Sequence, residues 1–291
     1  MTRLGASMAK NSEISWTHHT FNPWWGCAKV SPACQHCYAD LWARRMGHDL
    51  WGKAAPRRFF TDAHWKEPLQ WNDEAREEGE RHRVFCASMA DVFERRAELN
   101  STRLRLWALI DATPWLDWLL LTKRPQNIVD MVPWADTWPK NVWLGSTVEN
   151  QQCAEERLPL LLKYKAVVRF LSCEPLLGAI DLLPWFQREG YYPINWVIAG
   201  GESGPSARPM HPDWPKRLLN QCQTAKVAFH FKQWGHWVPA ELTGAGTKTT
   251  ALKFGVERPV MMARLKKKEA GRILEGATWD GFPTANSRVY A

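Results

Sequence analysis

The stretch from Thr20 to Asp40, with the sequence TFNPWWGCAKVSPACQHCYAD, is the one around which this chain is organised. It contains Cys27, Cys34 and Cys37 in the pattern C-x6-C-x2-C. Three thiolates this close in sequence can turn inward on one loop and bind a single centre. The arrangement favours a soft metal ion or an iron–sulfur cluster over disulfide pairing, which would leave one cysteine without a partner.

The residues on either side place this loop between a strand and a helix. Residues 14–21 have the character of a short strand, which Asn22 and Pro23 end because proline lacks the ladder donor and restricts the residue before it. Gly26 allows a tight turn just before Cys27. Residues 38–46 show helical spacing of Tyr38, Leu41 and Trp42. We therefore expect a strand, a cysteine loop and then a helix.

Length and composition indicate a globular protein with a substantial core. The chain has 291 residues, of which 45% are apolar and 23% charged, which suits one large α/β domain or two small ones. Nineteen tryptophans are unusual. Most are expected in the core, and some are expected to line a cleft where an indole can stack on a flat ligand.

Charge and cysteine content suggest a partner and a compartment. The formal net charge is +8, which favours a polyanion such as DNA or another nucleic acid, although a basic surface with no such role is an equal alternative. Part of the excess lies late, at Arg264, residues 266–268 and Arg272. Seven cysteines, no signal peptide and no membrane-length apolar run predict a reduced cytoplasmic setting without a membrane.

After the cysteine loop, short apolar runs alternate with helical segments. Residues 47–71 are expected to be irregular, and residues 72–83 an exposed helix or loop. Short apolar runs rich in branched and aromatic residues then predict buried strands, and amphipathic spacing predicts helices between them. The expected strands are residues 84–89, 118–122, 142–147, 166–172, 194–199 and 227–231, and the helices are residues 99–112, 126–132, 153–163 and 213–222.

This alternation predicts an α/β fold with parallel strands, as a full or partial (β/α) TIM-type barrel or an open sheet. Counting the first strand, about seven strands are expected. We expect residues 8–238 to form the barrel and residues 239–291 to form a C-terminal basic extension.

Polar or flexible residues follow six successive predicted strands. In a parallel barrel these positions share one rim with the cysteine loop, and active sites occupy that rim. Each could also be a chance strand-end residue, and lysines and carboxylates there could simply neutralise one another. The candidates at this rim are Asp91, Lys123, Ser146, Glu149, Cys173, Glu174, Gly200, Gly201, Glu202 and Lys232.

Alternative interpretations remain open for the glycine turn and for Cys173. Gly200, Gly201 and Glu202 begin a G-G-E-S-G turn whose amides could donate to a carboxylate or phosphate, although it lacks the dinucleotide-binding spacing and could be a plain glycine turn. Cys173 could be a thiol or radical partner, or a packed core thiol like Cys86, Cys153 and Cys222.

The loop resembles the cluster loop of radical S-adenosylmethionine (SAM) enzymes, most closely the spore photoproduct lyase type. The similarity lies in the segments NPWWGC at residues 22–27 and CQHCYA at residues 34–39. Radical SAM enzymes usually space these cysteines C-x3-C-x2-C, so we expect a widened loop here. Together with LLTKRP, GGESG and FKQWG, the chain is also similar to a phage-associated three-cysteine-motif family over residues 14–240.

The resemblance implies a radical SAM-like barrel in which Cys27, Cys34 and Cys37 bind three irons of a [4Fe-4S] cluster. The fourth iron stays open for S-adenosyl-L-methionine, whose reductive cleavage yields a 5′-deoxyadenosyl radical. An electron donor such as flavodoxin or ferredoxin would be a partner, and a nucleic-acid base, as in phage DNA modification or repair, a possible substrate. By position, the cofactor would be bound by Gly200, Gly201, Glu202, Ser146, Glu149 and Tyr38, and the catalytic candidates are Cys173, Glu174, Lys123 and Lys232.

The main alternative is a zinc site in a nucleic-acid-binding protein without catalysis. Zinc accepts three cysteines and one histidine, and His36, His18 or His19 could supply the fourth ligand. One of His18 and His19 must face inward, and a histidine packed or hydrogen-bonded in the core is more common than a histidine ligand.

Overall fold

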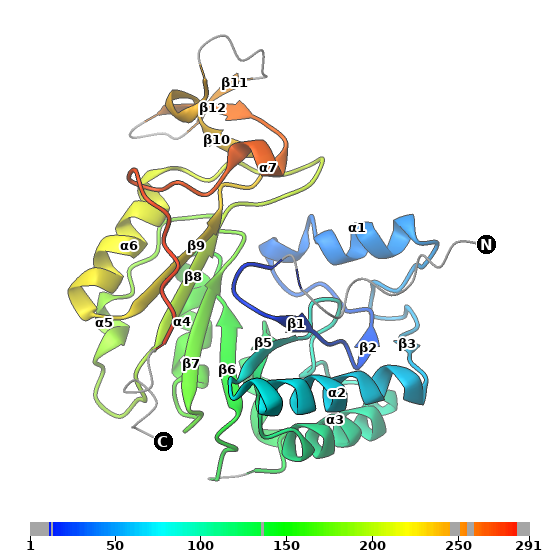
Figure 1. The fold of residues 1–291 in the computed structure, drawn as a ribbon. Coiled ribbons are helices and arrows are strands. Elements are labelled where there is room, and N and C mark those ends of the chain that lie inside the picture. The colour runs from blue at the N-terminus through cyan, green and yellow to red at the C-terminus, as the bar shows by residue number, and fades with distance from the viewer. Residues whose placement is uncertain (1–11, 13, 135–136, 245–250, 255–258, 284–291) are drawn as a thin grey trace.

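A seven-stranded parallel sheet forms the centre of the computed structural model, which describes residues 12, 14–134, 137–244, 251–254 and 259–283 (Figure 1). The strands follow one another in sequence order without a crossover, β1-β4-β5-β6-β7-β8-β9, and all neighbours are parallel. They are β1 (His19–Thr20), β4 (His82–Cys86), β5 (Leu116–Thr122), β6 (Val142–Thr147), β7 (Val168–Cys173), β8 (Trp196–Gly200) and β9 (Ala228–Gln233). β1 and β9 are the two edges, so the sheet is a partial barrel and the expected fold class is confirmed.

Helices between successive strands cover the outer face of this sheet. They are α2 (Asp62–Glu78), α3 (Asn100–Ala112), α4 (Gln151–Leu161), the short α5 (Leu183–Phe186) and α6 (Asp213–Ala225), with a 3-10 segment η3 (Pro125–Asp130) after β5. α2 packs on β4 and β5, α4 on β6, and α6 on β8 and β9. α1 (Tyr38–Arg45) lies apart from this layer, over the end of the sheet at which the strands finish (Figure 1). No helix in the described part of the chain is long and apolar enough to cross a bilayer.

Smaller elements flank the barrel. β2 (Trp24–Trp25) pairs antiparallel with β3 (Arg58–Phe59) within and after the cysteine loop. β10 (Trp237–Pro239), β11 (Ala251–Phe254) and β12 (Val260–Arg264) form a separate antiparallel sheet, followed by α7 (Lys267–Ala270). β10 spans the expected domain boundary at residue 238/239, and that division stays a prediction. Its outermost residues, 8–11 and 284–291, lie outside the described part of the chain.

Alternation along the strands separates two apolar cores. Side chains such as Leu120, Leu144 and Leu171 join the larger core between the sheet and the helices. Their neighbours of opposite parity, including Trp143 and Trp196, fill the inside of the partial barrel. Because strand side chains alternate with period two, this division also decides which strand-end residues face the barrel interior.

The tryptophans are buried or partly buried. All nineteen lie at described positions, and none of them is exposed. Inside the barrel Trp196 meets Trp143 edge-on with ring centroids 6.1 Å apart, and Trp16 meets it at 6.2 Å. The Phe170 ring lies across Gly145, where an added Cβ would come within 2.4 Å of it. The aromatic side chains therefore form a floor below the rim at which the strands end.

One expected segment is wrong. Residues 62–78 form the continuous helix α2, although residues 47–71 were expected to be irregular. The helix continues through Pro68 because its buried side chains, Trp65, Pro68, Trp71, Asn72 and Ala75, recur at helical spacing on the face that packs against the sheet. Burial of that face outweighs the hydrogen bond lost at the proline.

The gap between the edge strands is closed at the barrel floor by both ends of the described chain. Phe231 N–H donates to the Trp279 carbonyl at 2.9 Å, and Gly281 N–H donates to the Phe229 carbonyl at 2.9 Å, so residues 279–281 run along β9. Trp196 Nε1 donates to the Gly281 carbonyl at 2.8 Å. From the other end, Ser15 Oγ lies 2.9 Å from His230 Nε2.

We expect Gly281→Ala to destabilise the fold. A Cβ at this position would lie 2.7 Å from the Phe229 carbonyl oxygen and 2.9 Å from the Phe229 nitrogen. Residues 279–281, which run along β9, would therefore have to shift. Overpacking of this kind costs roughly 1–3 kcal/mol, measurable by urea denaturation. Thr278→Ala, at an exposed neighbouring position, is the control. Equal unfolding free energies for the two variants would contradict tight packing of residues 279–281 against β9.

Candidate metal centre at the cysteine loop

The cysteine loop lies where expected, between strand β1 and helix α1. Gly26, with φ +111°, makes the turn before Cys27, and a Cβ there would lie 2.7 Å from the Leu50 carbonyl oxygen, so only glycine fits. Cys27 pairs with Trp51 in an isolated parallel bridge. Residues 32–34 form a 3-10 turn, η1 (Pro32–Cys34), and Cys37 caps the start of α1. The strand-to-helix placement is thus confirmed.

Four carboxylate–arginine pairs hold the backbone of this loop, and we call them the loop anchors. Each pair is mostly buried, and each makes one contact with a backbone group of residues 28–33. Together they fix the loop from the ends of strands β4, β5, β6 and β8. The anchors are Asp91–Arg124, Glu94–Arg57, Glu149–Arg157 and Glu202–Arg208, with N–O distances of 2.6–2.8 Å.

Two anchors meet at Ala28. Its N–H donates to Glu94 Oε1 at 3.1 Å, and its carbonyl accepts from Arg124 Nη2 at 2.6 Å. Glu94 is paired with Arg57, whose side chain is fully buried and donates to the carbonyls of Leu50 and residues 52, 55 and 56. Both polar groups of one residue next to Cys27 are therefore fixed by charged partners.

The third anchor, Glu149–Arg157, holds the middle of the loop. Ala33 N–H donates to Glu149 Oε1 at 3.4 Å, and Arg157 Nη1 lies 2.7 Å from Glu149 Oε2. The Glu149 carboxylate is fully buried. Burial alone would raise its pKa, but the Arg157 guanidinium and a hydrogen bond from Ser31 hold the pKa of this carboxyl below its usual value. Glu149 is therefore a carboxylate that supports the loop next to Cys34.

The fourth anchor, Glu202–Arg208, reaches the same segment from the glycine turn after β8. Arg208 donates to Glu202 through its backbone N–H and its Nε, both at 2.8 Å. Its Nη2 also donates to the Pro32 carbonyl at 3.1 Å, and its Nη1 lies 3.4 Å from Gln35 Oε1. The Glu202 carboxylate is therefore occupied by an arginine that contacts the loop.

The three loop thiols differ from the other cysteines. Cys27, Cys34 and Cys37 are half-buried and free, whereas Cys86, Cys153, Cys173 and Cys222 are buried. The expectation that Cys86, Cys153 and Cys222 are packed thiols is confirmed. Only the loop thiols are thus placed to meet a ligand at the rim.

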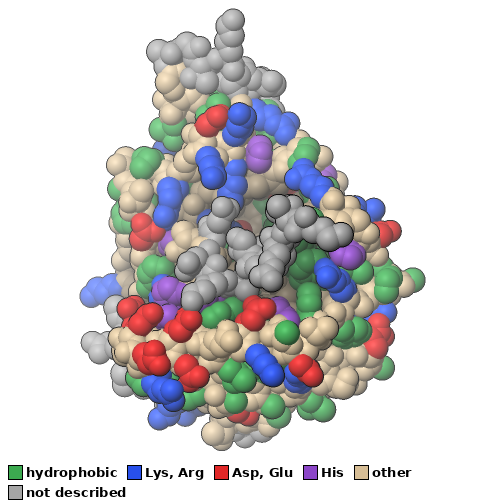
Figure 2. Space-filling view, turned by 45° about the vertical axis from the view of Figure 1, so that its right-hand side comes forward, with side chains coloured by type: hydrophobic (Ala, Val, Ile, Leu, Met, Phe, Trp, Pro, Cys, Tyr) green, Lys and Arg blue, Asp and Glu red, His purple; other side chains and the backbone are tan. Residues whose placement is uncertain are grey.

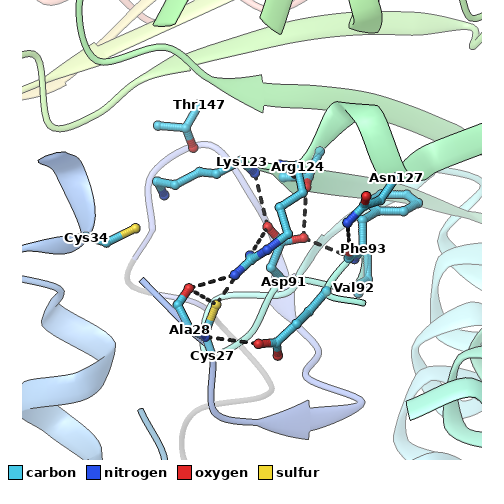
Figure 3. A network of polar contacts seen from close by, with 12 residues as sticks. Cys27, Ala28, Cys34, Asp91, Val92, Phe93, Lys123, Arg124, Asn127 and Thr147 are labelled. Atoms are coloured by element: carbon cyan, nitrogen blue, oxygen red, sulfur yellow. Dashed lines mark hydrogen bonds and ion pairs between the residues drawn. The ribbon is translucent and has the colours of Figure 1, made fainter. Parts of the chain in front are cut away.

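Their electrostatic environments also differ. Burial raises the pKa of Cys27 to about 12, against the lowering effect of Arg124. Burial likewise raises the pKa of Cys37. For Cys34 burial is outweighed by the positive charge of Lys123 and by hydrogen bonds from the loop, so its pKa is lowered. Figure 3 shows the Lys123 side chain extending toward Cys34 and the Cys27 sulfur pointing at Arg124. Cationic groups therefore face the thiols from β5.

The donor set fits an iron–sulfur cluster better than a single ion. No three His, Cys, Asp or Glu side chains in the described ranges are arranged to hold one metal ion. A zinc site needs four ligands converging on one atom, whereas cluster thiolates each bind a different iron. Three half-buried thiols spread along one loop suit the second arrangement.

Two of the three histidines considered for zinc, His18 and His19, lie at the opposite end of the strands, whereas His36 lies inside the loop between Cys34 and Cys37. His18 Nδ1 accepts from Arg83 N–H at 2.7 Å, at the start of β4. His19 is buried, stacks on Trp71 with centroids 4.5 Å apart, and its Nε2 lies 3.2 Å from His82 Nδ1. The expectation that one of the pair faces inward is thus met by His19. The partners Arg83, Trp71 and His82 of these two imidazoles lie on α2 and at the start of β4.

Three predicted residues share the barrel interior. Lys232 Nζ lies 3.1 Å from Glu174 Oε1, with the side chains 22% and 12% exposed, and Ser172 Oγ donates to Glu174 at 3.4 Å. Lys232 and His230 are two residues apart on β9, so their side chains point to the same face of the sheet. The His230 ring lies 6.2 Å from that of Trp196, which belongs to the inner core. Lys123 has the corresponding parity on β5. A charged pair and a further lysine thus lie between the aromatic floor and the rim.

Other predicted residues have structural partners. Cys173 is fully buried in the outer core, and Ser146, of the same parity as Leu144, donates to the Thr122 carbonyl at 3.0 Å. Both side chains therefore face the helices. Tyr38 begins α1 and donates its hydroxyl to the Ser88 carbonyl at 2.9 Å, while its ring is half exposed. This bond ties the helix after the loop to the segment after β4.

The glycine turn allows close backbone packing. A Cβ on Gly201 would lie 1.9 Å from the Trp234 carbonyl oxygen, and one on Gly200 would lie 2.8 Å from Glu174 Oε1. The close approaches at these glycines are thus made by the loop after β9 and by the Glu174 carboxylate. Whether a cofactor also meets Gly200, Gly201 or Glu202 stays a prediction.

Sequence reasoning missed the arginine halves of the loop anchors. Arg57, Arg157 and Arg208 lie in a connecting segment, a helix and a turn, where arginine is usually an exposed residue. Nothing in their spacing marks them, since their partners lie 8 and 6 residues away for Arg157 and Arg208 but 37 for Arg57. Only the folded chain brings the pairs together.

Comparisons with known proteins place the chain in a family. A family model described as "Protein of unknown function (DUF5131)" matches residues 11–283. The chain belongs to this family. No curated protein matches the DUF5131 chain.

Solved structures of spore photoproduct lyase are similar to it. Two mutant structures, each 15% identical with a TM-score of 0.47, cover 88% and 90% of this chain and 71% and 72% of theirs. A third mutant, with bound AdoMet and dinucleoside spore photoproduct, is 12% identical with a TM-score of 0.43, covering 85% of this chain and 68% of its own. The fold class itself rests on the sheet topology described above.

Proposed function

We propose that this DUF5131 protein is a radical SAM-type enzyme whose Cys27, Cys34 and Cys37 bind a [4Fe-4S] cluster. The observation that carries the proposal is the position of the loop. Three free, half-buried thiols lie at the rim where seven parallel strands end. A cluster bound by three thiolates keeps one iron open for S-adenosyl-L-methionine, and the cluster-loop resemblance of residues 22–39 supports the same assignment.

When bound, the cluster and S-adenosyl-L-methionine supply one-electron chemistry that protein side chains cannot perform. The chain contributes binding, orientation and exclusion of water. The loop anchors fix the backbone that carries the thiols, so that little ordering is needed on binding. The aromatic floor, with Trp143, Phe170 and Trp196, closes the barrel below the rim. Glu174 and Lys232 present an acceptor and a donor above this floor, suited to the polar groups of a bound cofactor or substrate.

Anaerobic reconstitution tests this proposal. The protein would be loaded with iron and sulfide, reduced and given S-adenosyl-L-methionine, and the products searched for 5′-deoxyadenosine. We expect a brown protein with about four irons per chain and reductive cleavage of the cofactor. A colourless protein that holds one zinc and forms no 5′-deoxyadenosine would refute the proposal.

We further propose that the substrate is a nucleic-acid base. The net charge of +8 and the exposed basic residues 266–268, which follow the small sheet beside the rim, support a polyanionic substrate. Figure 2 shows most of the Lys and Arg side chains of this face in its upper half and most of the Asp and Glu side chains in its lower half. The tryptophans do not contribute to the argument, since none of them is exposed. DNA binding that falls steeply with salt is expected, and binding indifferent to ionic strength would contradict a nucleic-acid substrate.

A further inference from the structure

We propose that Arg124, held in place by Asp91, raises the reduction potential of the cluster through a charged hydrogen bond to Cys27. This inference rests on the proposed function, because it concerns the cluster that the loop would hold. It assigns Arg124 a positioning and tuning role, and not a catalytic one. It also makes the three cysteine ligands electronically unequal.

The contact itself is direct. Arg124 Nη1 lies 3.5 Å from Cys27 Sγ, within hydrogen-bonding range for sulfur, and the same nitrogen lies 2.8 Å from Asp91 Oδ2. Nη2 of the same guanidinium donates to the Ala28 carbonyl. In Figure 3 the guanidinium lies between Asp91 and the Cys27–Ala28 segment, with its donors directed at both. One planar group thus contacts the thiol and the peptide next to it.

Asp91 keeps the guanidinium in this position. Its Oδ1 accepts from Thr122 Oγ1 at 2.8 Å and from Phe93 N–H at 3.0 Å, and its Oδ2 accepts from Lys123 N–H at 3.1 Å. The Asp91 and Arg124 side chains are each only 7% exposed. A carboxylate with this many donors cannot rotate freely, so the arginine it binds is fixed as well.

The donors to the three sulfurs differ in charge. Cys27 receives a guanidinium, whereas Ser31 Oγ lies 3.7 Å from Cys34 Sγ and backbone groups of the first turn of α1 face Cys37. Lys123 acts on Cys34 and Cys37 by its charge. Cys27 is therefore the loop cysteine that accepts a hydrogen bond from a cationic side chain, that of Arg124.

Reduction adds a negative charge to a cluster, so a cationic donor at a ligating sulfur stabilises the reduced form more than the oxidised form. Hydrogen bonds to sulfur and local charge are recognised determinants of cluster potential. Removing the charge of Arg124 should therefore lower the potential. Asp91→Asn removes a negative charge but keeps a side-chain oxygen that can accept from Arg124, so the guanidinium stays in place and the potential should rise. If the two substitutions only disturbed the structure of the loop, opposite shifts of the reduction potential would not be expected.

The experiment is a redox titration of the reconstituted full chain, followed by electron paramagnetic resonance. For Arg124→Gln we expect at least a tenfold shift of the reduction equilibrium toward the oxidised cluster, which is about 59 mV for one electron. For Asp91→Asn we expect a shift of opposite sign. Arg76→Gln is the control, because it removes an exposed guanidinium that pairs with Asp73 on α2 and is not one of the loop anchors. Its potential should equal that of the unaltered protein.

The outcomes separate this inference from the proposed function. Opposite shifts for Arg124→Gln and Asp91→Asn, with Arg76→Gln unchanged, support it. Unchanged potentials, or shifts of the same sign, overturn it while leaving the cluster assignment intact. If Arg124→Gln holds no cluster, the sign of the Asp91→Asn shift decides alone. An unaltered protein that takes up no cluster would instead refute the proposed function.

Discussion

Cys34→Ala is expected to abolish cluster binding and cleavage of S-adenosyl-L-methionine while the barrel still folds. Cys34 is half-buried on the loop and belongs to neither barrel core. With two thiolates left, the loop cannot hold a cluster that depends on three. Iron content should fall from about four per chain to near zero, and 5′-deoxyadenosine should disappear. The unfolding free energy should change by less than about 1 kcal/mol.

The matched control for this substitution is Cys222→Ala. It also removes one thiol, but from the buried face of α6, so iron content and cofactor cleavage should persist although packing is lost. Unaltered iron content and cleavage in Cys34→Ala would show that Cys34 is not a ligand. Circular dichroism of both variants would verify that the α/β fold remains.

Glu149→Ala is expected to have the largest effect on stability among single substitutions at the loop anchors. It removes a fully buried carboxylate and leaves Arg157, 7% exposed, without its counter-charge. Breaking a buried pair on one side costs roughly 3–5 kcal/mol. Ala33 N–H would also lose its acceptor. Urea denaturation should show the loss, and hydrogen exchange of residues 27–37 should accelerate.

Two comparisons make this result specific. Glu149→Gln keeps the side-chain shape and an acceptor oxygen, so its loss should be smaller than that of Glu149→Ala. Asp73→Ala removes an exposed carboxylate that pairs with Arg76 at 3.1 Å on α2, and it should change stability by less than about 0.5 kcal/mol. Equal stabilities of Glu149→Ala and Asp73→Ala would contradict the anchoring role of Glu149.

Much of the fold could be predicted because its signals are local. Apolar runs bounded by polar residues predicted six strands of the sheet, and Cys27, Gly26 and Pro23 marked the loop between β1 and α1. The error at α2 arose because residues 47–71 were judged by composition, although the buried positions of Trp65, Pro68 and Trp71 have helical spacing. The face that a helix buries against a sheet can decide its structure despite an internal proline.

The candidate site was less predictable, because its supports join residues far apart in sequence. Alternation along a strand would have predicted part of it. Ser146 and Cys173 are two residues after Leu144 and Leu171, so their side chains point to the same face of the sheet, toward the helices. No local sequence pattern, however, predicts that Arg57 pairs with Glu94 or that Arg208 donates to the Pro32 carbonyl. Such pairs exist only when strand ends come together.

The sequence by itself determined the three-thiol loop, its place between a strand and a helix, and the succession of parallel strands, because each depends on neighbouring residues. Only the tertiary structure decided which charged groups surround the loop. It shows that four carboxylate–arginine pairs from four strand ends fix the loop backbone, and that Arg124 contacts Cys27. The physical reason is that a buried charge must find its counter-charge in space, and the parallel sheet brings distant carboxyl ends to one rim.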